Sequence, residues 1–425
     1  MKRIIALPLA GAALLAAATA AWLLWPTAPV AVAPAAPAAS ALAVPAPAAL
    51  VQRGAYLARA GNCAACHTER GGADYAGGKG LATPFGTVYA SNLTPDADTG
   101  IGRWSADDFW RAMHHGQSRD GRLLYPAFPY TEYTRVRRED ADALFAYLQS
   151  LPPVAQANRP HALGWPYRTQ AALKVWRALF FTPGTFEADA SRSAEWNRGA
   201  YLVQGLGHCQ ACHAPRNAFG ATATSLDLSG GLIPLQKWYA PSLAAADEAG
   251  LQRWSEDEAV QLLRDGRSAH GAMLGPMAEV VAGSTRHLDE SDLRAMANFL
   301  RALPEQPVRR ERGEPATAQV LERGAGLYEQ HCAQCHGAQG EGHEGLYLPL
   351  AGNRSVGLQD PTNLLRLIVS GGFTPSTAGN PRPFGMPPFG QDLSDADIAA
   401  VASFVRSRWG NEAGRVLPLD VQKVR

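Results

Sequence analysis

The 425-residue sequence has almost no net charge, because 39 Lys and Arg side chains are balanced by 38 Asp and Glu. That balance excludes the strongly basic footprint of nucleic-acid binding, so no nucleic-acid partner is expected. The sequence also lacks a Gly-x-Gly-x-x-Gly loop after a predicted strand, which argues against a bound flavin or nicotinamide dinucleotide. Charged residues make up only 18% of the chain against 46% hydrophobic ones. This composition excludes a disordered chain, and the length suits about three domains.

Cysteine is scarce as well, and all six cysteines belong to three copies of a C-x-x-C-H motif. Three such motifs that use every cysteine cannot be a chance occurrence. The alternatives are a thioredoxin-like redox pair, a zinc site or short disulfides. A redox pair needs neither the histidine nor three copies, and zinc needs two C-x-x-C pairs close together. The copies are Cys63-Ala64-Ala65-Cys66-His67, Cys209-Gln210-Ala211-Cys212-His213 and Cys332-Ala333-Gln334-Cys335-His336.

The motif is the attachment pattern of c-type haem. Two sulfurs about one helical turn apart reach the two vinyl groups on one edge of the porphyrin, and the next residue supplies the proximal iron ligand. The sequence therefore predicts three covalently bound haem c groups. Their predicted proximal ligands are His67, His213 and His336.

Methionine is the common sixth ligand in cytochromes c, and the chain has only six methionines. In the third copy the one candidate is Met386, which lies in a loop that prolines stiffen. It is the predicted sixth ligand. In the second copy the choices are Met273 and Met277. We favour Met277, which follows Gly275-Pro276.

The first copy differs, because its matching loop has Phe128 and phenylalanine cannot bind iron. The middle of this copy offers Met113, His114 and His115 instead. We predict His114 as the sixth ligand, with His115, Met113 or an open iron as the alternatives. Since a thioether raises the potential of haem iron more than an imidazole does, the first haem should have the lowest potential of the three.

A larger internal repeat surrounds the motifs. An Arg-Gly-Ala-x-Leu string precedes each motif and predicts a first helix; the strings begin at Arg53, Arg198 and Arg323. An apolar stripe behind an acidic first turn predicts a final helix in each copy; the acidic residues are Asp140, Asp292 and Asp397. Middle helices are predicted between them, over residues 105–116, 255–266 and 363–370. Ser105 and Ser255 are the expected N-caps, and Gly116 and Gly266 the expected stops.

The N-terminus predicts export. Lys2 and Arg3 precede an apolar run over residues 4–25 that is long enough to span a bilayer, and the positive flank leaves the rest of the chain outside the cytoplasm. A cleaved signal peptide, with Ala41-Leu42-Ala43 as the cleavage pattern, is the alternative. The chain is therefore expected at the periplasmic face of the bacterial inner membrane, or free in the periplasm if it is cleaved.

The predicted fold class is all-α, with three tandem cytochrome c-like haem domains after an N-terminal membrane anchor. The predicted boundaries are 1–25 for the anchor, 26–46 for an Ala/Pro-rich tether, 47–156, 191–306 and 315–412 for the haem domains, 157–190 for a Trp-rich segment packed between domains, and 413–425 for a C-terminal tail.

The sequence resembles the membrane-anchored three-haem cytochrome c subunits of bacterial periplasmic dehydrogenases that act on alcohols, gluconate and other polyols, or aldehydes. The resemblance covers nearly everything after the tether. Besides the three C-x-x-C-H motifs, it is carried by Thr83-Pro84-Phe85-Gly86, Ser91-Asn92-Leu93-Thr94-Pro95-Asp96, Thr99-Gly100-Ile101-Gly102, Ala214-Pro215-Arg216-Asn217, Gly275-Pro276-Met277-Ala278-Glu279-Val280-Val281 and Trp409-Gly410-Asn411. In this family methionine usually stands in place of Phe128. The Tyr125–Tyr130 loop is similar to that of cytochromes paired with molybdenum hydroxylases.

The resemblance implies an electron-transfer subunit with no substrate-oxidising site of its own. Such subunits accept electrons from a catalytic subunit that uses a quinone, flavin or molybdenum cofactor, and pass them to ubiquinone or a terminal oxidase. Two other functions stay open from the sequence. One is a cytochrome c subunit of a terminal oxidase, and the other is a haem peroxidase that uses the first haem.

Overall fold

The computed structural model describes residues 19, 21–23, 25, 27–31, 46–268, 271–306 and 313–425. Most of the predicted anchor and tether lies outside these residues. Within them, no helix is both long enough and apolar enough to cross a membrane. The chain divides into two compact units, Met1–Gly54 with Cys66–Phe186 and Ala55–Ala65 with Glu187–Arg425.

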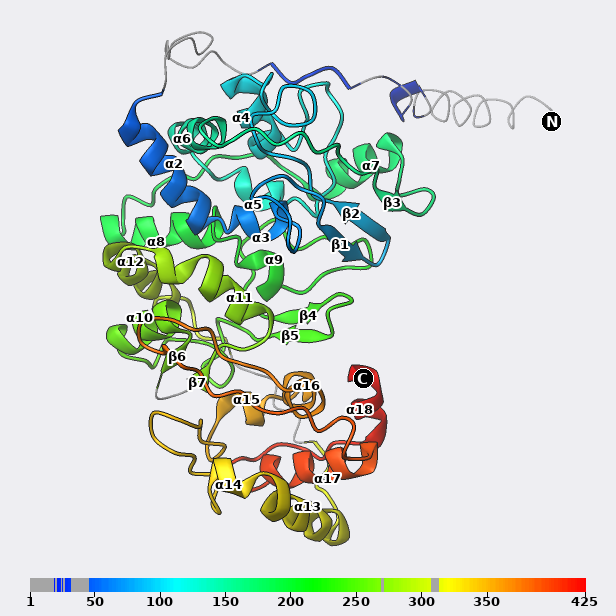
Figure 1. Ribbon diagram of the computed structural model, residues 1–425, viewed down its shortest axis with the longest axis vertical. Helices are drawn as coiled ribbons and strands as arrows, with labels where there is room; N and C mark the ends of the chain where they lie inside the picture. Colours follow the sequence, from blue (N-terminus) through cyan, green and yellow to red (C-terminus); the bar gives the residue numbers. More distant parts are fainter. Residues whose placement is uncertain are drawn as a thin grey trace, which may run out of the picture. The chain divides into compact units, whose positions relative to one another are not determined.

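Short helices dominate both units, and the strands that accompany them have two to four residues (Figure 1). The helical character expected from the sequence is thus confirmed in the described residues. In the first part of the chain the elements are α2 (Ala48–Ala60), α3 (Cys63–His67), β1 (Gly80–Thr83), β2 (Gly86–Tyr89), α4 (Ala106–His115), α5 (Tyr130–Tyr133), α6 (Arg138–Gln149), β3 (Ala162–Leu163) and α7 (Gln170–Phe180). The next are α8 (Ala194–Gln204), α9 (Gln210–His213), β4 (Gly231–Ile233), β5 (Trp238–Ala240), α10 (Glu256–Asp265), β6 (Arg267–Ser268), β7 (Gly271–Ala272), α11 (Pro276–Gly283), η1 (Thr285–His287) and α12 (Glu290–Arg301). The last are α13 (Ala318–His331), α14 (Ala333–His336), α15 (Arg354–Gly357), α16 (Thr362–Ser370), α17 (Asp395–Arg406) and α18 (Pro418–Val424).

The glycine of each Arg-Gly-Ala string marks a close crossing of the first and last helices of a repeat. A Cβ added to any of the three glycines would lie within 2.3 Å of a backbone oxygen in the last helix, which no real side chain tolerates. The crossing therefore requires glycine, since only its missing side chain lets the two backbones meet. The pairs are Gly54 with Ala143, Gly199 with Ala295, and Gly324 with Ala400.

The arginine of the same string binds the acidic residue in the first turn of the last helix. The three ion pairs have one geometry, with 2.8 Å from the arginine Nε to a carboxylate oxygen: Arg53 with Asp140, Arg198 with Asp292, and Arg323 with Asp397. A charged pair and a glycine contact thus join the same two helices in all three repeats. Both strings are visible in the sequence, and the structure shows that they are partners.

The predicted helix caps are confirmed. Ser105 and Ser255 each accept a hydrogen bond from the third residue of the following helix in a reciprocal capping box. Gly116 and Gly266 end the two helices with φ of 56° and 67°, the left-handed conformation that glycine adopts without strain. The third middle helix, α16, spans Thr362–Ser370.

The segment predicted to lie between domains, residues 157–190, packs on the first unit over most of its length. Strand β3 adds to the β1–β2 hairpin through antiparallel pairing with β2. At the start of α7, the side chain of Gln170 accepts a hydrogen bond from the backbone N–H of Leu123 at 2.8 Å. At its end, the Phe181 ring meets the Tyr130 ring edge-on at 4.9 Å.

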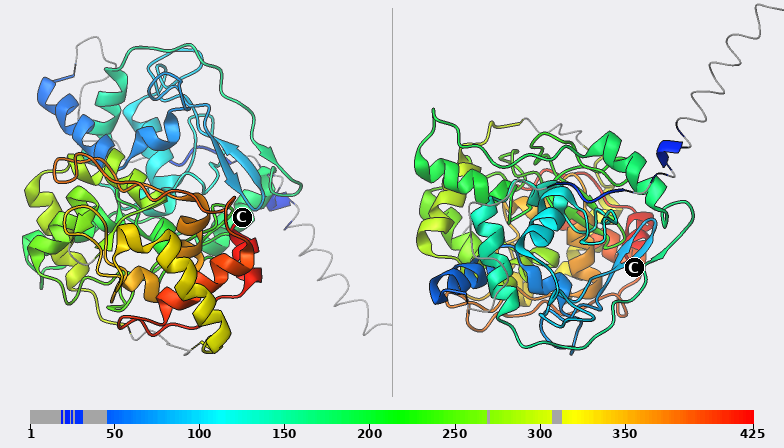
Figure 2. Two further views of the ribbon diagram at one scale, coloured as in Figure 1. Left: turned by 60° about the horizontal axis from the view of Figure 1, so that its bottom comes forward. Right: turned by 90° about the horizontal axis from the view of Figure 1, so that it is seen from above.

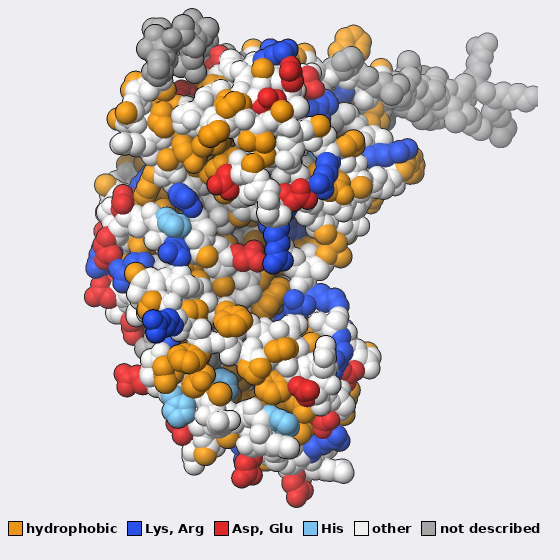
Figure 3. Space-filling model, in the orientation of Figure 1, with side chains coloured by type: hydrophobic (Ala, Val, Ile, Leu, Met, Phe, Trp, Pro, Cys, Tyr) orange, Lys and Arg blue, Asp and Glu red, His pale blue; other side chains and the backbone are white. Residues whose placement is uncertain are grey.

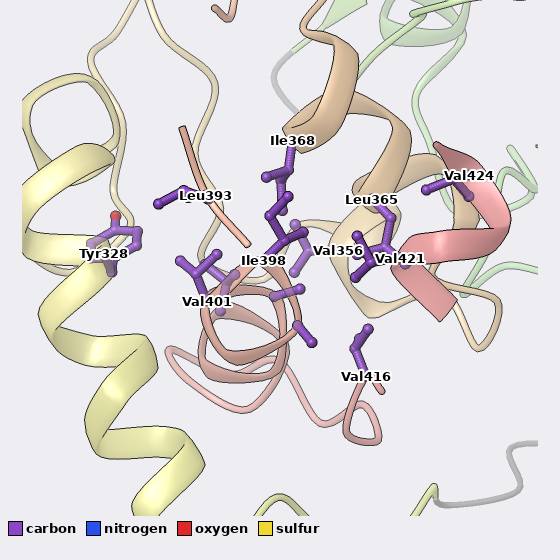
Figure 4. Packing of buried hydrophobic residues seen from close by; sticks show 13 residues of the cluster. Tyr328, Val356, Leu365, Ile368, Leu393, Ile398, Val401, Val416, Val421 and Val424 are labelled. Atoms are coloured by element: carbon purple, nitrogen blue, oxygen red, sulfur yellow. The ribbon is translucent and has the colours of Figure 1, made fainter. Parts of the chain in front are cut away.

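One hydrophobic cluster forms the core of the third repeat. Tyr328 of α13, Leu365 of α16 and Ile398 of α17 all belong to it (Figure 4). The segment placed beyond the third domain, residues 413–425, also contributes, because Val421 of α18 is fully buried in the same cluster. Figures 1 and 2 both show α18 beside α17 at the red end of the chain.

Candidate haem-attachment sites

Each C-x-x-C-H motif contains a single helical turn: α3 covers the whole first motif, and α9 and α14 begin directly after Cys209 and Cys332, which are their N-caps. One turn of helix places the two thiols on neighbouring positions of the same face, which is the spacing that two vinyl groups on one porphyrin edge require. None of the six cysteines forms a disulfide, and each is at least partly exposed. Burial raises the pKa of Cys209 to about 12 and that of Cys332 to about 11, so both are thiols at neutral pH.

The motif histidines share one anchoring contact. The Nδ1 atom of each ring lies against a backbone carbonyl: that of Ser91 at 2.7 Å for His67, that of Pro241 at 2.7 Å for His213, and that of Leu348 at 3.1 Å for His336. A carbonyl oxygen can only accept, so Nδ1 carries the proton and Nε2 keeps its lone pair for a metal.

Burial also lowers the pKa of all three motif histidines, and the carbonyl contact only partly offsets it. The rings are therefore neutral at physiological pH. A neutral imidazole with a fixed tautomer is the form that binds haem iron. The sequence revealed the histidines but not their carbonyl partners. Of these partners, only Ser91 stood in a string that the family resemblance had marked.

In the third repeat the structure brings a motif cysteine and the predicted sixth ligand to one place. Cys332 and Met386 both pack against the core cluster of that repeat, together with Phe389 and Trp409. Two backbone hydrogen bonds of 2.9 and 3.0 Å between Met386 and Gly372 fix the methionine loop to the end of α16.

The neighbouring Gly371 allows that approach. It has φ of 67°, and a Cβ there would lie 2.4 Å from the carbonyl oxygen of Met386. Large hydrophobic side chains are also exposed on this repeat; they are Leu346, Phe373 and Phe384. Figure 3 shows hydrophobic side chains in orange on the surface of the molecule.

In the second repeat Met277 lies in the first turn of α11, directly after Gly275 and Pro276. Gly275 has φ of 56° and packs against the Trp238 ring, where a Cβ would come within 2.6 Å. The start of α11 is therefore held against Trp238 of β5. Met273 donates its backbone N–H to the Gly266 carbonyl at 2.8 Å. Both methionines are half-buried.

In the first repeat His114 is buried in α4. Its ring stacks on Trp110 at 4.5 Å with an interplanar angle of 15°, and its Nδ1 lies 3.5 Å from the Thr134 hydroxyl. Burial lowers the pKa of His114, so its ring is neutral. The alternative sixth ligands, Met113 and His115, are its neighbours in the chain. Met113 is buried. Burial and neighbouring positive charge lower the pKa of His115 to about 4. Phe128 packs against Tyr133 at 5.3 Å.

The residues present therefore fit haem c. Each repeat supplies two cysteines one turn apart that form no disulfide, and a neutral histidine whose Nε2 keeps its lone pair. The third repeat adds a thioether and apolar side chains around the same cluster.

Comparisons with known proteins agree with this chemistry. The cytochrome c family model matches residues 51–152 and 321–409. The cytochrome c subunit of the quinone alcohol dehydrogenase of Gluconobacter oxydans (strain 621H) is 41% identical over 394 residues, which cover 89% of this chain and 82% of the relative. The chain belongs to the family of cytochrome c subunits of dehydrogenases.

Other relatives are subunits of different dehydrogenases. The gluconate 2-dehydrogenase cytochrome c subunit of Pantoea cypripedii is 42% identical over 396 residues, which cover 89% of the cytochrome and 90% of the relative. A nicotinate dehydrogenase subunit of Pseudomonas putida is 43% identical over 371 residues, which cover 85% of the cytochrome and 30% of that longer protein. The cytochrome is therefore an electron-transfer subunit of dehydrogenases that binds haem c covalently.

Proposed function

We propose that the cytochrome carries three haem c groups, one in each of the domains 47–156, 191–306 and 315–412. The observation that supports this is the threefold recurrence of one arrangement: a motif helix with its histidine anchored on a carbonyl, inside a pair of helices joined by a glycine crossing and an Arg–Asp pair. The second repeat lies outside the two regions that the family model matches. It has the same arrangement as the other two, and this supports a haem there too.

The proposed attachment residues are Cys63 and Cys66, Cys209 and Cys212, and Cys332 and Cys335, with His67, His213 and His336 as proximal ligands. The proposed sixth ligands are His114, Met277 and Met386. When bound, each haem accepts and releases one electron at its iron. The chain's own contribution is to keep each proximal imidazole neutral and oriented, and to set each potential through the sixth ligand.

The proposed partners follow from the relatives. The names of the relatives pair them with alcohol, gluconate and nicotinate dehydrogenases. We propose that the cytochrome takes electrons from such a catalytic subunit, which uses a quinone, flavin or molybdenum cofactor, and passes them to ubiquinone or a terminal oxidase. Residues 1–25 would anchor it at the periplasmic face of the inner membrane, with residues 26–46 as the tether.

Haem stoichiometry tests the central claim. The intact mass of the mature protein and its haem content by pyridine haemochrome assay should both give three haem c per chain. Replacing both cysteines of the second motif, Cys209→Ser with Cys212→Ser, should remove one of them and leave two. A wild-type value of two, unchanged by that double substitution, would restrict haem to the first and third repeats.

Co-purification tests the partner. The cytochrome solubilised from native membranes should carry a dehydrogenase catalytic subunit, whose substrate should reduce the cytochrome within the complex. Recovery with a copper–haem oxidase and without a dehydrogenase would contradict the proposed electron donor.

A further inference from the structure

Helix α7 of the first unit has apolar side chains on two sides. On its inner side Leu173 is buried and Trp176 approaches the Tyr130 ring. On its outer side Val175 and Leu179, one turn apart, are 41% and 64% exposed. A surface helix ordinarily turns charged residues outward, so a second apolar side indicates a second apolar partner.

N-terminal residues that the structure describes contact the same helix. The Lys174 ammonium donates hydrogen bonds to the carbonyls of Trp22 at 3.1 Å and Leu23 at 3.3 Å, and also to that of Trp25. Lysine at such carbonyls caps a helix end and complements its dipole. Trp22 and Trp25 are 49% and 74% exposed. They are the residue type that collects at the boundary between membrane and water.

A cavity of about 580 Å³ lies between these elements. Its walls are mostly apolar, with Trp25 and Phe181 among them, and Lys174 and Arg177 are its two charged residues. Within the described chain no carboxylate pairs with Arg177, and one of its terminal nitrogens is buried without a hydrogen-bond partner. The three donors of the Lys174 ammonium are taken by the three carbonyls, whereas Arg177 stacks on the Tyr130 and Phe181 rings and keeps an unpaired nitrogen. A cation without an anion in an apolar setting favours a ligand with a negative head and an apolar body.

We propose that α7 lies in the headgroup layer of the membrane, with Val175 and Leu179 toward the acyl chains and with the cavity holding the phosphate of an anionic phospholipid beside Arg177. The inference rests on the proposed anchor, because residues 1–25 bring the first unit to the bilayer. An amphipathic helix that contributes both apolar area and cations binds such an interface in its plane.

A fluorescent probe on Leu179 tests this in the full-length holoprotein. In the three-haem cytochrome every native cysteine is bonded to haem, so Leu179→Cys supplies one thiol for an environment-sensitive label. Leu232→Cys is the matched control, since Leu232 is a 57% exposed leucine on β4. The labelled proteins are reconstituted in vesicles of phosphatidylethanolamine with phosphatidylglycerol. The measurements are co-flotation, the emission shift, and quenching by lipids that carry a nitroxide near the headgroup.

The expected result is co-flotation of both variants, with a blue shift and nitroxide quenching at position 179 only. Loss of co-flotation would refute the proposed anchor, and this inference with it. Co-flotation with a probe at 179 that stays in water would leave the anchor standing and overturn the inference. Replacing phosphatidylglycerol with phosphatidylcholine should reduce the shift, and an equal shift on both vesicles would overturn the role given to Arg177.

Discussion

The glycine crossings predict that two glycines of one helix respond oppositely to the same substitution. Gly324 and Gly326 both lie in α13. A Cβ at Gly324 would lie 2.3 Å from the Ala400 carbonyl and 2.7 Å from the Phe404 Cβ, whereas a Cβ at Gly326 meets nothing within 4 Å. Overpacking of a fixed contact costs about 1–3 kcal/mol. In contrast, Gly→Ala at an open helix position stabilises by about 0.5–1 kcal/mol.

Hydrogen exchange followed by mass spectrometry measures this locally in the full chain. Because 1.4 kcal/mol corresponds to a tenfold change, Gly324→Ala should speed exchange in α13 and α17 by about 5- to 150-fold. Gly326→Ala should slow it by about 2- to 5-fold. Similar exchange in the two variants would refute the idea that backbone contact at Gly324 holds the helix pair together.

Three further predictions concern the ion pairs and the iron ligands. Burial works to raise the pKa of Asp292, but hydrogen bonds from Arg198 and Tyr56 outweigh it and hold the pKa below its usual range. The contribution of this carboxylate to folding stability is therefore complete above about pH 4, and it is lost as the pH falls through the lowered native pKa. Arg198→Gln should lower the free energy of unfolding, measured by thermal denaturation, by about 1–3 kcal/mol at pH 7 and by less in acid. An equal loss at both pH values would contradict this prediction. Met386→Ala should lower the potential of one haem in a redox titration, because a thioether raises it, and an unchanged titration would exclude Met386 as a ligand. The first haem should be reduced at the lowest potential of the three, and His114→Ala should give one high-spin ferric haem; a low-spin spectrum would point to His115 or Met113 instead.

The helices were predictable wherever their ends carry side-chain signals. Ser105 with Gly116 and Ser255 with Gly266 delimit α4 and α10 as expected, because caps and left-handed glycines act within one turn. The burial of α18 was not predictable, since the short stretch around Val421 has no periodicity of its own and is fixed only by packing on the third core.

The proposed haem-attachment residues could be nominated from the sequence alone, because covalent attachment demands a fixed spacing. Their immediate partners could not. The acceptors for His213 and His336 are backbone oxygens of Pro241 and Leu348, and every residue has such an oxygen. The partner of Arg198 was hidden for another reason: Asp292 was recognised as an acidic first-turn residue, but only the folded chain shows which cation it meets.

The carbonyl contacts of the motif histidines have an evolutionary consequence. A carboxylate partner would give the proximal ring imidazolate character, and a point mutation could add or remove it. A main-chain oxygen such as that of Ser91 stays in place whatever side chain replaces the serine. Substitution of these residues would therefore leave the proposed proximal imidazoles anchored, and a mutation that changes a haem potential would have to act elsewhere, for instance at a proposed sixth ligand.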